Sequence, residues 1–176
     1  MILGTGVGGG VVVRGHLLRG PNRIAGEWGH NPLPSPTDAD LPAPPCYCGR
    51  HGCVETYLCG AGLLLDHGRR GAPEEDPPRD AAEVARRAAA GDPRAIASIE
   101  RYAERLARSL GVVIDILDPD VVVLGGGLSN VDALYDLVPP LLGPYVFSDS
   151  VRTRIARNVH RDSSGVRGAA FLGANG

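Results

Sequence analysis

The strongest hydrophobic pattern in the chain runs from Pro93 to Leu117, where apolar residues recur at alternating spacings of three and four. These residues are Ile96, Ile99, Ala103, Leu106, Leu110, Val113 and Leu117. The period places them on one face of an α-helix about 37 Å long. Asp92 is a natural N-cap, Pro93 is a natural first helical residue, and the helix should stop before Pro119. The pattern predicts one long amphipathic helix; a coiled-coil seam is the alternative, although the stripe spans barely three heptads.

An uninterrupted Val-Val-Val-Leu run follows at 121–124. Such a run is typical of a fully buried strand in a parallel sheet. Gly125, Gly126 and Gly127 then form a turn at the carboxyl end of this strand. Because ligands of open α/β sheets bind at that end, we expect the turn to face a ligand.

The first residues also read as strands. From Ile2 to Arg14, apolar β-branched runs flank a glycine-rich turn, and a second turn at 14–16 leads to a short strand at 17–18. Glycine lets the main chain approach an anion closely, so the first turn could hold a phosphate. A glycine-rich hairpin without a ligand is an equal alternative. No Gly-Lys-Ser/Thr follows, so the turn is not a Walker A loop.

Shorter elements fill the rest of the chain. The patterns predict a helix between Glu55 and Gly71, a proline-rich linker at 72–80, a helix at 81–90, a helix from Val131 to Val138 that Pro139-Pro140 interrupts, a strand at 153–159 and a helix at 165–172. Ser129 and Asp132 resemble a capping box for the 131–138 helix. The chain therefore reads as helices mixed with short strands.

Composition limits the classes of protein to consider. The 176 residues are 43% hydrophobic and 22% charged, with a net charge of −2, which is ordinary for one globular domain. No dense basic patch favours nucleic acid as a partner. No basic and apolar leader and no run approaching 18 apolar residues is present, so we expect neither a signal peptide nor a membrane span, and a cytoplasmic protein.

Residues 26–55 carry the clearest chemical signal. Cys46, Cys48 and Cys53 form a C-x-C-x4-C cluster, and His30 lies upstream of it. Thiolate and imidazole are the ligands that tetrahedral zinc prefers. The segment is rich in proline and poor in large apolar residues, so burial alone cannot fold it. A structural zinc contributes about 10 kcal/mol or more, which is enough to order such a loop.

Other interpretations of these cysteines remain open at this point. Cys46 or Cys48 could pair with Cys53 or Cys59 in an oxidising compartment, although nothing else in the chain looks secreted. The thiols could also be free beside a surface histidine. Within the zinc interpretation, Cys59 could replace His30 as the fourth ligand.

Four motifs together resemble the ROK family, which comprises bacterial sugar kinases and related sugar-responsive repressors. They are LGTGVGGG at 3–10, GEWGHNPLP at 26–34, CYCGRHGCVE at 46–55 and LDPDVVVLGGG at 117–127. The sequence of the second motif, together with SNVDALY and DSSGVRGAA further along the chain, is most similar to the fructokinase branch, which is also described as manno-fructokinase or glucokinase-like. The resemblance implies an α/β fold of the actin-like ATPase (ribonuclease H-like) type, with a zinc-binding loop inserted in one lobe.

The resemblance also implies roles for particular residues. His30, Cys46, Cys48 and Cys53 match the zinc ligands of the family, which favours His30 over Cys59. The residues that match sugar contacts are Glu27, His30 and Glu55. Those that match nucleotide contacts are Gly4, Thr5, Gly6, Gly125, Gly126 and Gly127. The zinc loop would then be a scaffold for the sugar site rather than a catalytic metal centre.

The chain also departs from the family pattern. The D-x-G-G-T-K phosphate loop and the N-D-A-N-type motif with the catalytic aspartate are not found, and both would lie upstream of Met1. The resemblance thus implies that residues 1–176 are a carboxyl-terminal lobe without the N-terminal lobe. Within it we expect a zinc and sugar loop at 26–58 and an adenosine-side helix, strand and glycine turn at 93–130.

No carboxylate of the chain is an evident substitute for that catalytic base. Asp38 and Asp40 fall in the proline-rich loop, and Asp115 and Asp118 fall in the long helix or at its end. The isolated chain should therefore turn over very slowly. Apolar surface that normally packs on another lobe should be exposed and should promote association.

The resemblance implies ATP-dependent phosphorylation of a hexose, most simply fructose, with Mg²⁺ bound to ATP and a homodimer as the full-length assembly. A sugar-binding module of a ROK-type repressor is one alternative, but no helix-turn-helix or basic reading helix is evident. A non-catalytic remnant held together by zinc is the other. The sequence does not separate fructose from glucose, mannose or an N-acetylated hexose.

Overall fold

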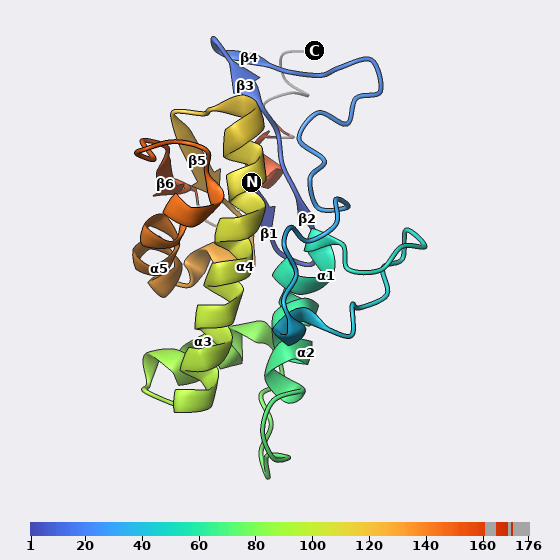
Figure 1. Cartoon of the computed structure of the whole chain (residues 1–176), viewed down its shortest axis with the longest axis vertical. Helices are drawn as coiled ribbons and strands as arrows, with labels where there is room; N and C mark the ends of the chain where they lie inside the picture. The colour runs from blue at the N-terminus through green and yellow to red at the C-terminus, as the bar shows by residue number, and fades with distance from the viewer. Residues whose placement is uncertain (161–164, 169, 171–176) are drawn as a thin grey trace.

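A long central helix organises the molecule (Figure 1). The computed structural model describes residues 1–160, 165–168 and 170. Helix α4 spans Pro93–Leu117 and crosses the middle of the view, with β1, β2, α1 and α2 on one side and β5, β6 and α5 on the other. The bounds of the strands are β1 Ile2–Leu3, β2 Val7–Gly8, β3 Val12–Val13, β4 His16–Leu17, β5 Val121–Leu124 and β6 Arg154–Arg157. Those of the helices are α1 Val54–Leu58, α2 Gly60–Gly68, α3 Ala81–Ala89 and α5 Ala133–Leu141, with 3-10 turns η1 Asp38–Asp40, η2 Gly127–Asn130 and η3 Gly143–Tyr145.

Helix α4 has the predicted bounds. The Asp92 carboxylate accepts hydrogen bonds from Arg94 N at 2.8 Å and Ala95 N at 3.1 Å, as an N-cap does. The helix ends at Asp118, which takes a left-handed conformation (φ 41°) before Pro119. The predicted stripe is buried in its middle but exposed at its ends, where Ile96 and Leu117 face solvent.

The strands form small paired units. β1 and β2 form an antiparallel hairpin, β3 and β4 form a second one, and β5 pairs in parallel with β6. A parallel bridge between Ile2 and Gly125 connects the first hairpin to the end of β5. The prediction of a fully buried strand at 121–124 is wrong, because its side chains alternate: Val122 and Leu124 are buried, whereas Val123 is 43% exposed.

The predicted single helix between Glu55 and Gly71 is instead two helices. Cys59 is extended (ψ 167°) between α1 and α2. The break turns Gly60 N toward the first hairpin, where it donates to Gly4 O at 2.8 Å. On the other side of the break, the Tyr102 hydroxyl of α4 donates to Leu58 O at 2.8 Å. Tertiary hydrogen bonds thus replace helical ones at this position.

Two predictions about α5 are also wrong. Pro139 and Pro140 do not interrupt the helix but lie inside its last turns, where their fixed φ is helical and only their missing N–H groups cost hydrogen bonds. Ser129 and Asp132 form no capping box. The Ser129 hydroxyl donates to Gly126 O at 2.7 Å, and Asp132 pairs with Arg157.

The remaining predicted elements fare better. The helix at 81–90 and the strand at 153–159 appear as α3 and β6. Residues 165–168 and 170 are helical, and the rest of the predicted 165–172 helix lies outside the described residues. Among the described residues, no helix is both long and apolar enough to cross a membrane. The core lies between α4, the first hairpin, α1, α2, β5 and α5.

Candidate functional site

The turn of the first hairpin, Gly4 to Gly6, lies at the centre of the site. A Cβ on Gly6 would come within 2.7 Å of Glu55 Oε2, so the carboxylate lies directly against this turn. Val7 N donates to the same oxygen at 2.8 Å. Because helix α1 begins at Val54, Glu55 is fixed in its first turn and held against the hairpin.

A second carboxylate follows the same strand. A Cβ on Gly8 would lie 3.8 Å from Glu27 Oε2. Gly6 lies in the turn and Gly8 in β2, and neither has a side chain that would keep a carboxylate away. Glu55 and Glu27, the two predicted sugar-contacting carboxylates, therefore both lie against the first hairpin.

The segment at 28–31 is docked on the hairpin and on α1. A Cβ on Gly29 would meet Val7 O at 2.0 Å, so only glycine allows this approach. The Trp28 indole donates to Gly8 O at 2.9 Å, Glu55 N donates to Gly29 O at 2.8 Å, and Val54 N donates to Asn31 O at 2.9 Å. These contacts fix His30 beside Glu55, with 3.9 Å between His30 Nε2 and Glu55 Oε1.

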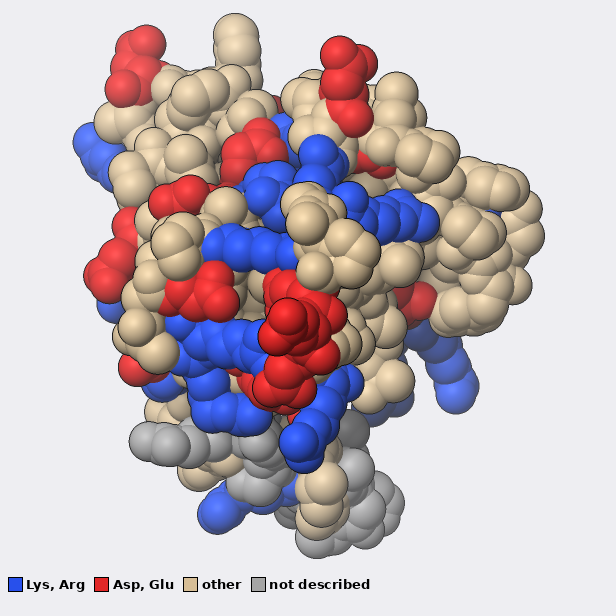
Figure 2. Space-filling model, turned by 90° about the horizontal axis from the view of Figure 1, so that it is seen from below, with Lys and Arg blue, Asp and Glu red and all other residues tan. Residues whose placement is uncertain are grey.

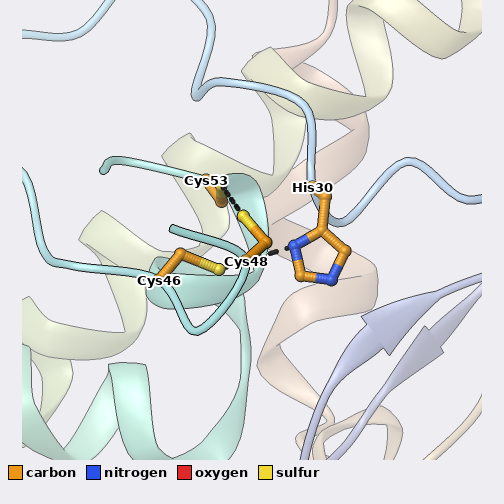
Figure 3. A group of neighbouring side chains, drawn as sticks. All are labelled: His30, Cys46, Cys48 and Cys53. Atoms are coloured by element: carbon orange, nitrogen blue, oxygen red, sulfur yellow. Dashed lines mark hydrogen bonds between the residues drawn. The ribbon is translucent and has the colours of Figure 1, made fainter. Parts of the chain in front are cut away.

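Four predicted metal ligands converge next to these residues (Figure 3). The ligand atoms of His30, Cys46, Cys48 and Cys53 all lie within 4.8 Å of one another. His30 Nδ1 is 3.5 Å from Cys46 Sγ, and the sulfurs of Cys48 and Cys53 are 3.7 Å apart. All four cysteines of the chain lie in the described part and are unbridged.

These separations fit a tetrahedral zinc ion. With Zn–S bonds of about 2.3 Å and a Zn–N bond of about 2.05 Å, two sulfurs should lie about 3.8 Å apart, and a sulfur and a nitrogen about 3.6 Å apart. The two close pairs match these values. Cys59 does not join the group; its sulfur instead accepts a hydrogen bond from Gly62 N at 3.3 Å at the start of α2. Of the two alternatives for the fourth ligand, the geometry brings His30, not Cys59, to the cluster.

The thiols of the cluster differ in how readily they ionise. The Arg50 guanidinium, whose Nε lies 3.5 Å from the sulfur, lowers the pKa of Cys48 to about 6. Burial raises the pKa of Cys53 to about 12. Zinc binds thiolates, so a bound ion would release the proton of Cys53.

Tyr47 is a site residue that the sequence analysis missed. Its hydroxyl is 2.8 Å from His30 Nε2, and the two rings meet edge to face with centroids 5.0 Å apart. The sequence feature that could have identified Tyr47 is its position between Cys46 and Cys48. A residue between two ligands of a cluster is held beside the other groups of that cluster. His30 thus turns Nδ1 toward the sulfurs and Nε2 toward Tyr47 and Glu55.

A buried ion-pair network anchors the loop to α4, and the sequence analysis missed it too. Asp40 Oδ1 accepts from Arg105 Nε at 2.7 Å, and Asp40 Oδ2 accepts from Arg108 Nη2 at 2.9 Å. Although burial acts in the opposite direction, a hydrogen bond from Thr37 N and those from the two arginines lower the pKa of Asp40 to about 2. Asp40 is therefore a structural anion and is unsuited to accept a proton from a substrate.

The predicted nucleotide residues divide between two places. Gly4, Thr5 and Gly127 line a cavity of about 1120 Å³ that is also bounded by α2, α3, α4 and α5. Gly6 lies against Glu55 instead. Gly125 accepts a hydrogen bond from Leu3 N and donates one to Met1 O. Gly126 (φ 81°) lies so close to Leu3 that a Cβ would be 2.5 Å from Leu3 O. Gly125 and Gly126 therefore shape the turn rather than line the cavity.

The cavity is mostly apolar, and charged residues of both signs also line it. Its wall includes Ile99 and Leu128, and its charged lining residues are Arg79, Arg86, Asp80, Glu100, Asp132 and Asp136. An apolar cavity of this size with a few polar groups suits a small organic ligand. In the view from below, acidic and basic side chains are interspersed, and no single-sign basic surface covers that face (Figure 2).

Comparison with known proteins places this geometry in a family. A family model described as the ROK family matches residues 1–175. The chain is 41% identical over 178 residues to an N-acetyl-D-glucosamine kinase of Yersinia pseudotuberculosis, covering 98% of this chain and 57% of the relative. The chain thus spans little more than half the length of the curated relatives that it matches.

Two solved structures share the fold. A ROK family glucokinase from Streptomyces griseus, in complex with glucose and AMPPNP, superposes with a TM-score of 0.82 at 25% identity, covering 99% of this chain and 59% of the other. A ROK hexokinase from Thermus thermophilus gives a TM-score of 0.76 at 31% identity, covering 98% of this chain and 58% of the other. Both are sugar kinases of the α/β, actin-like ATPase type.

Proposed function

The chain belongs to the ROK family, and from this membership we propose that it supplies the sugar-binding wall and part of the nucleotide site of an ATP-dependent hexose kinase. The observation that carries the proposal is the position of the Gly4–Gly6 turn. Gly6 of this turn lies against Glu55, whereas Gly4 and Thr5 line the large cavity. A sugar at the carboxylates and a nucleotide in the cavity would therefore meet at this turn.

The proposed sugar contacts follow from hydrogen-bond chemistry. The carboxylates of Glu27 and Glu55 accept hydrogen bonds from sugar hydroxyls, and both lie against the first hairpin. His30 would bind zinc through Nδ1 and keep Nε2 available for a hydroxyl, in an orientation fixed by the metal. A zinc ion at His30, Cys46, Cys48 and Cys53 would order the loop that carries these groups, and we give it no step in the reaction.

The proposed nucleotide contacts are divided as the geometry suggests. Gly4, Thr5 and Gly127 would face the nucleotide, whereas Gly6, Gly125 and Gly126 would act through the backbone of the turns. The phosphates would lie toward Thr5, with Mg²⁺ bound to ATP. The glucokinase that shares this fold is in complex with AMPPNP, which supports a nucleotide as a ligand of the full-length protein.

Phosphoryl transfer also requires a group that takes the proton of the attacking hydroxyl. We do not assign Glu27 or Glu55 to this role, because both are proposed to hold the sugar. Asp40 is excluded by its two arginine partners. No carboxylate described above is assigned this role, so we propose that residues 1–176 bind substrates and contribute little turnover by themselves.

The identity of the hexose is a finer proposal. The sequences of the motifs led us to expect fructose. The relatives described above do not support it, because they are an N-acetylglucosamine kinase, a glucokinase and a hexokinase. We propose an aldohexose, either glucose or N-acetylglucosamine. A repressor module is less favoured, because these relatives are kinases. A homodimer and a cytoplasmic location, where ATP is available, complete the proposal.

A thermal-shift titration tests the proposed function. Glucose, N-acetylglucosamine, mannose and fructose are each added to the zinc-loaded chain, and ADP release is followed by a coupled assay. We expect stabilisation by at least one aldohexose and very low ADP release. Glu27→Gln should weaken sugar binding by roughly tenfold or more, because a hydrogen bond to a charged group is lost, while bound zinc is unchanged.

Glu75→Gln provides the matched control, because Glu75 is an exposed carboxylate in the 72–80 loop. It should bind sugar as the wild-type chain does. Full zinc content without stabilisation by any hexose would contradict the kinase proposal and favour a zinc-stabilised remnant.

A further inference from the structure

Tyr47 has an unusual position among the residues of the site. It lies between Cys46 and Cys48, its side chain is 84% exposed, and its hydroxyl contacts His30 Nε2 at 2.8 Å. Among the described residues, His30 provides the only hydrogen bond to this hydroxyl and the only ring contact. An exposed tyrosine held by one contact can leave that contact at low cost.

The atom that Tyr47 contacts is the one that a sugar should need. Because Nδ1 of His30 faces the sulfur of Cys46, a metal at the cluster would occupy Nδ1 and leave the proton on Nε2. Nε2–H then donates, and the Tyr47 oxygen accepts. The same nitrogen is 3.9 Å from Glu55 Oε1, so it lies beside a proposed sugar-binding carboxylate.

The Tyr47 side chain is a phenol whose oxygen accepts from His30 Nε2–H in this arrangement. It therefore presents to His30 the same chemistry as a hydroxyl of a hexose.

We propose that Tyr47 caps the sugar site: its hydroxyl occupies the position of a sugar hydroxyl at His30 Nε2 in the ligand-free protein and yields that position when a hexose binds. The ring then covers an apolar C–H face of the sugar. This inference rests on the proposed function and assigns to that site a residue that competes with the substrate and then closes over it.

Calorimetric titration of glucose and of N-acetylglucosamine into the wild-type chain, Tyr47→Phe and Tyr47→Ala tests the cap. Tyr47→Phe keeps the ring but removes the competing hydroxyl, so sugar affinity should rise about two- to tenfold, the range of one net hydrogen bond. Tyr47→Ala also removes the ring, so it should bind about fivefold or more weakly than Tyr47→Phe. Zinc content should be equal in all three proteins.

Phe147→Ala removes an aromatic side chain that is 99% exposed elsewhere on the surface, and it should bind sugar as the wild type does. Wild-type affinity or weaker affinity in Tyr47→Phe would overturn the competition, and equal affinities of Tyr47→Phe and Tyr47→Ala would overturn the covering ring. If the wild-type chain binds neither sugar, the kinase proposal itself fails and the cap fails with it, whereas failure of the cap alone leaves wild-type binding intact.

Discussion

Asp40 shows how single side chains hold the proposed sugar loop in place. Its carboxylate is almost completely buried between Arg105 and Arg108 of α4, and the hydroxyl of Tyr57 donates to its main-chain oxygen at 2.9 Å. Arg105 continues to Asp66 of α2 at 2.9 Å. A loop with few apolar residues is thus attached to the core by charged hydrogen bonds, which are about twice as strong as neutral ones.

This attachment predicts a pH dependence of stability. The folded-state pKa of Asp40, about 2, lies below its ordinary value of 3.8, so the unfolded chain binds the proton first. The stabilisation is fully present above about pH 5 and is lost as the pH falls through about 2. The free energy of unfolding of the wild type, minus that of Asp40→Asn, should fall by about 2 kcal/mol between pH 5 and pH 2.

Urea unfolding at several pH values measures this difference, and zinc release at low pH is common to both proteins and cancels. Asp38→Asn, a change at an exposed carboxylate two residues away, should leave stability nearly unchanged. A difference between wild type and Asp40→Asn that does not vary with pH would show that the ion pairs do not stabilise the folded state.

At the scale of elements, the first hairpin and the segment at 28–31 pack through backbone contact. Gly29 is the closest point, because any Cβ there would overlap Val7 O. The same hairpin contacts Glu55 through Val7 N and α2 through Gly4 O. One glycine contact therefore positions the elements that carry the whole proposed sugar site.

Gly29→Ala should separate this segment from the hairpin. Overpacking of this kind typically costs about 1–3 kcal/mol, and here it should also weaken hexose binding because His30 and Glu55 move apart. Denaturant unfolding and hexose titration measure the two effects. Gly68→Ala is the matched control, because nothing lies within 4 Å of a Cβ at that position; it should be neutral in both. Equal behaviour of the two variants would argue against the packing described here.

The sequence predicted elements whose signals are local. Helix α4 was predicted with its observed bounds because Asp92, Pro93 and Pro119 mark its ends independently of any other element. The convergence of Cys46, Cys48 and Cys53 was predicted because these residues are close in sequence. The break at Cys59 was not predicted, since the hydrogen bonds that stabilise it come from Gly4 and Tyr102, far along the chain.

Charged residues inside the core were the other feature that the sequence did not predict. Arg105 and Arg108 look like the solvent-facing side of an amphipathic helix, and only the folded loop brings Asp40 to them. Val123 was expected to be buried because its neighbours in sequence are apolar, whereas exposure depends on which strands pair with β5. Non-local partners, rather than local propensity, decided each of these cases.

At the scale of the whole molecule, apolar side chains remain exposed in several regions. The most exposed large apolar residues include Val12, Ile24, Ile116, Phe147 and Val159. Val12 lies in the β3–β4 hairpin, which Figure 1 shows at one end of the molecule. Exposed apolar surface of this kind promotes association.

We therefore expect the chain to form dimers or larger species in solution. Light scattering coupled to gel filtration should show a mass above 18.4 kDa that rises with concentration. Val12→Lys should shift the population toward monomer, because a charge cannot be buried cheaply in an apolar contact. A monodisperse wild-type monomer at high concentration would contradict this expectation.

The account depends most directly on the dependence of sugar binding on zinc. The decisive measurement is a calorimetric titration of N-acetylglucosamine and glucose into the chain as purified with zinc, after chelation, and after zinc is restored. We predict one zinc ion per chain, binding of at least one sugar by the zinc-loaded chain, loss of this binding on chelation, and its recovery with zinc. Sugar affinity that is unchanged without zinc would contradict the claim that a metal at His30, Cys46, Cys48 and Cys53 forms the wall of the sugar site.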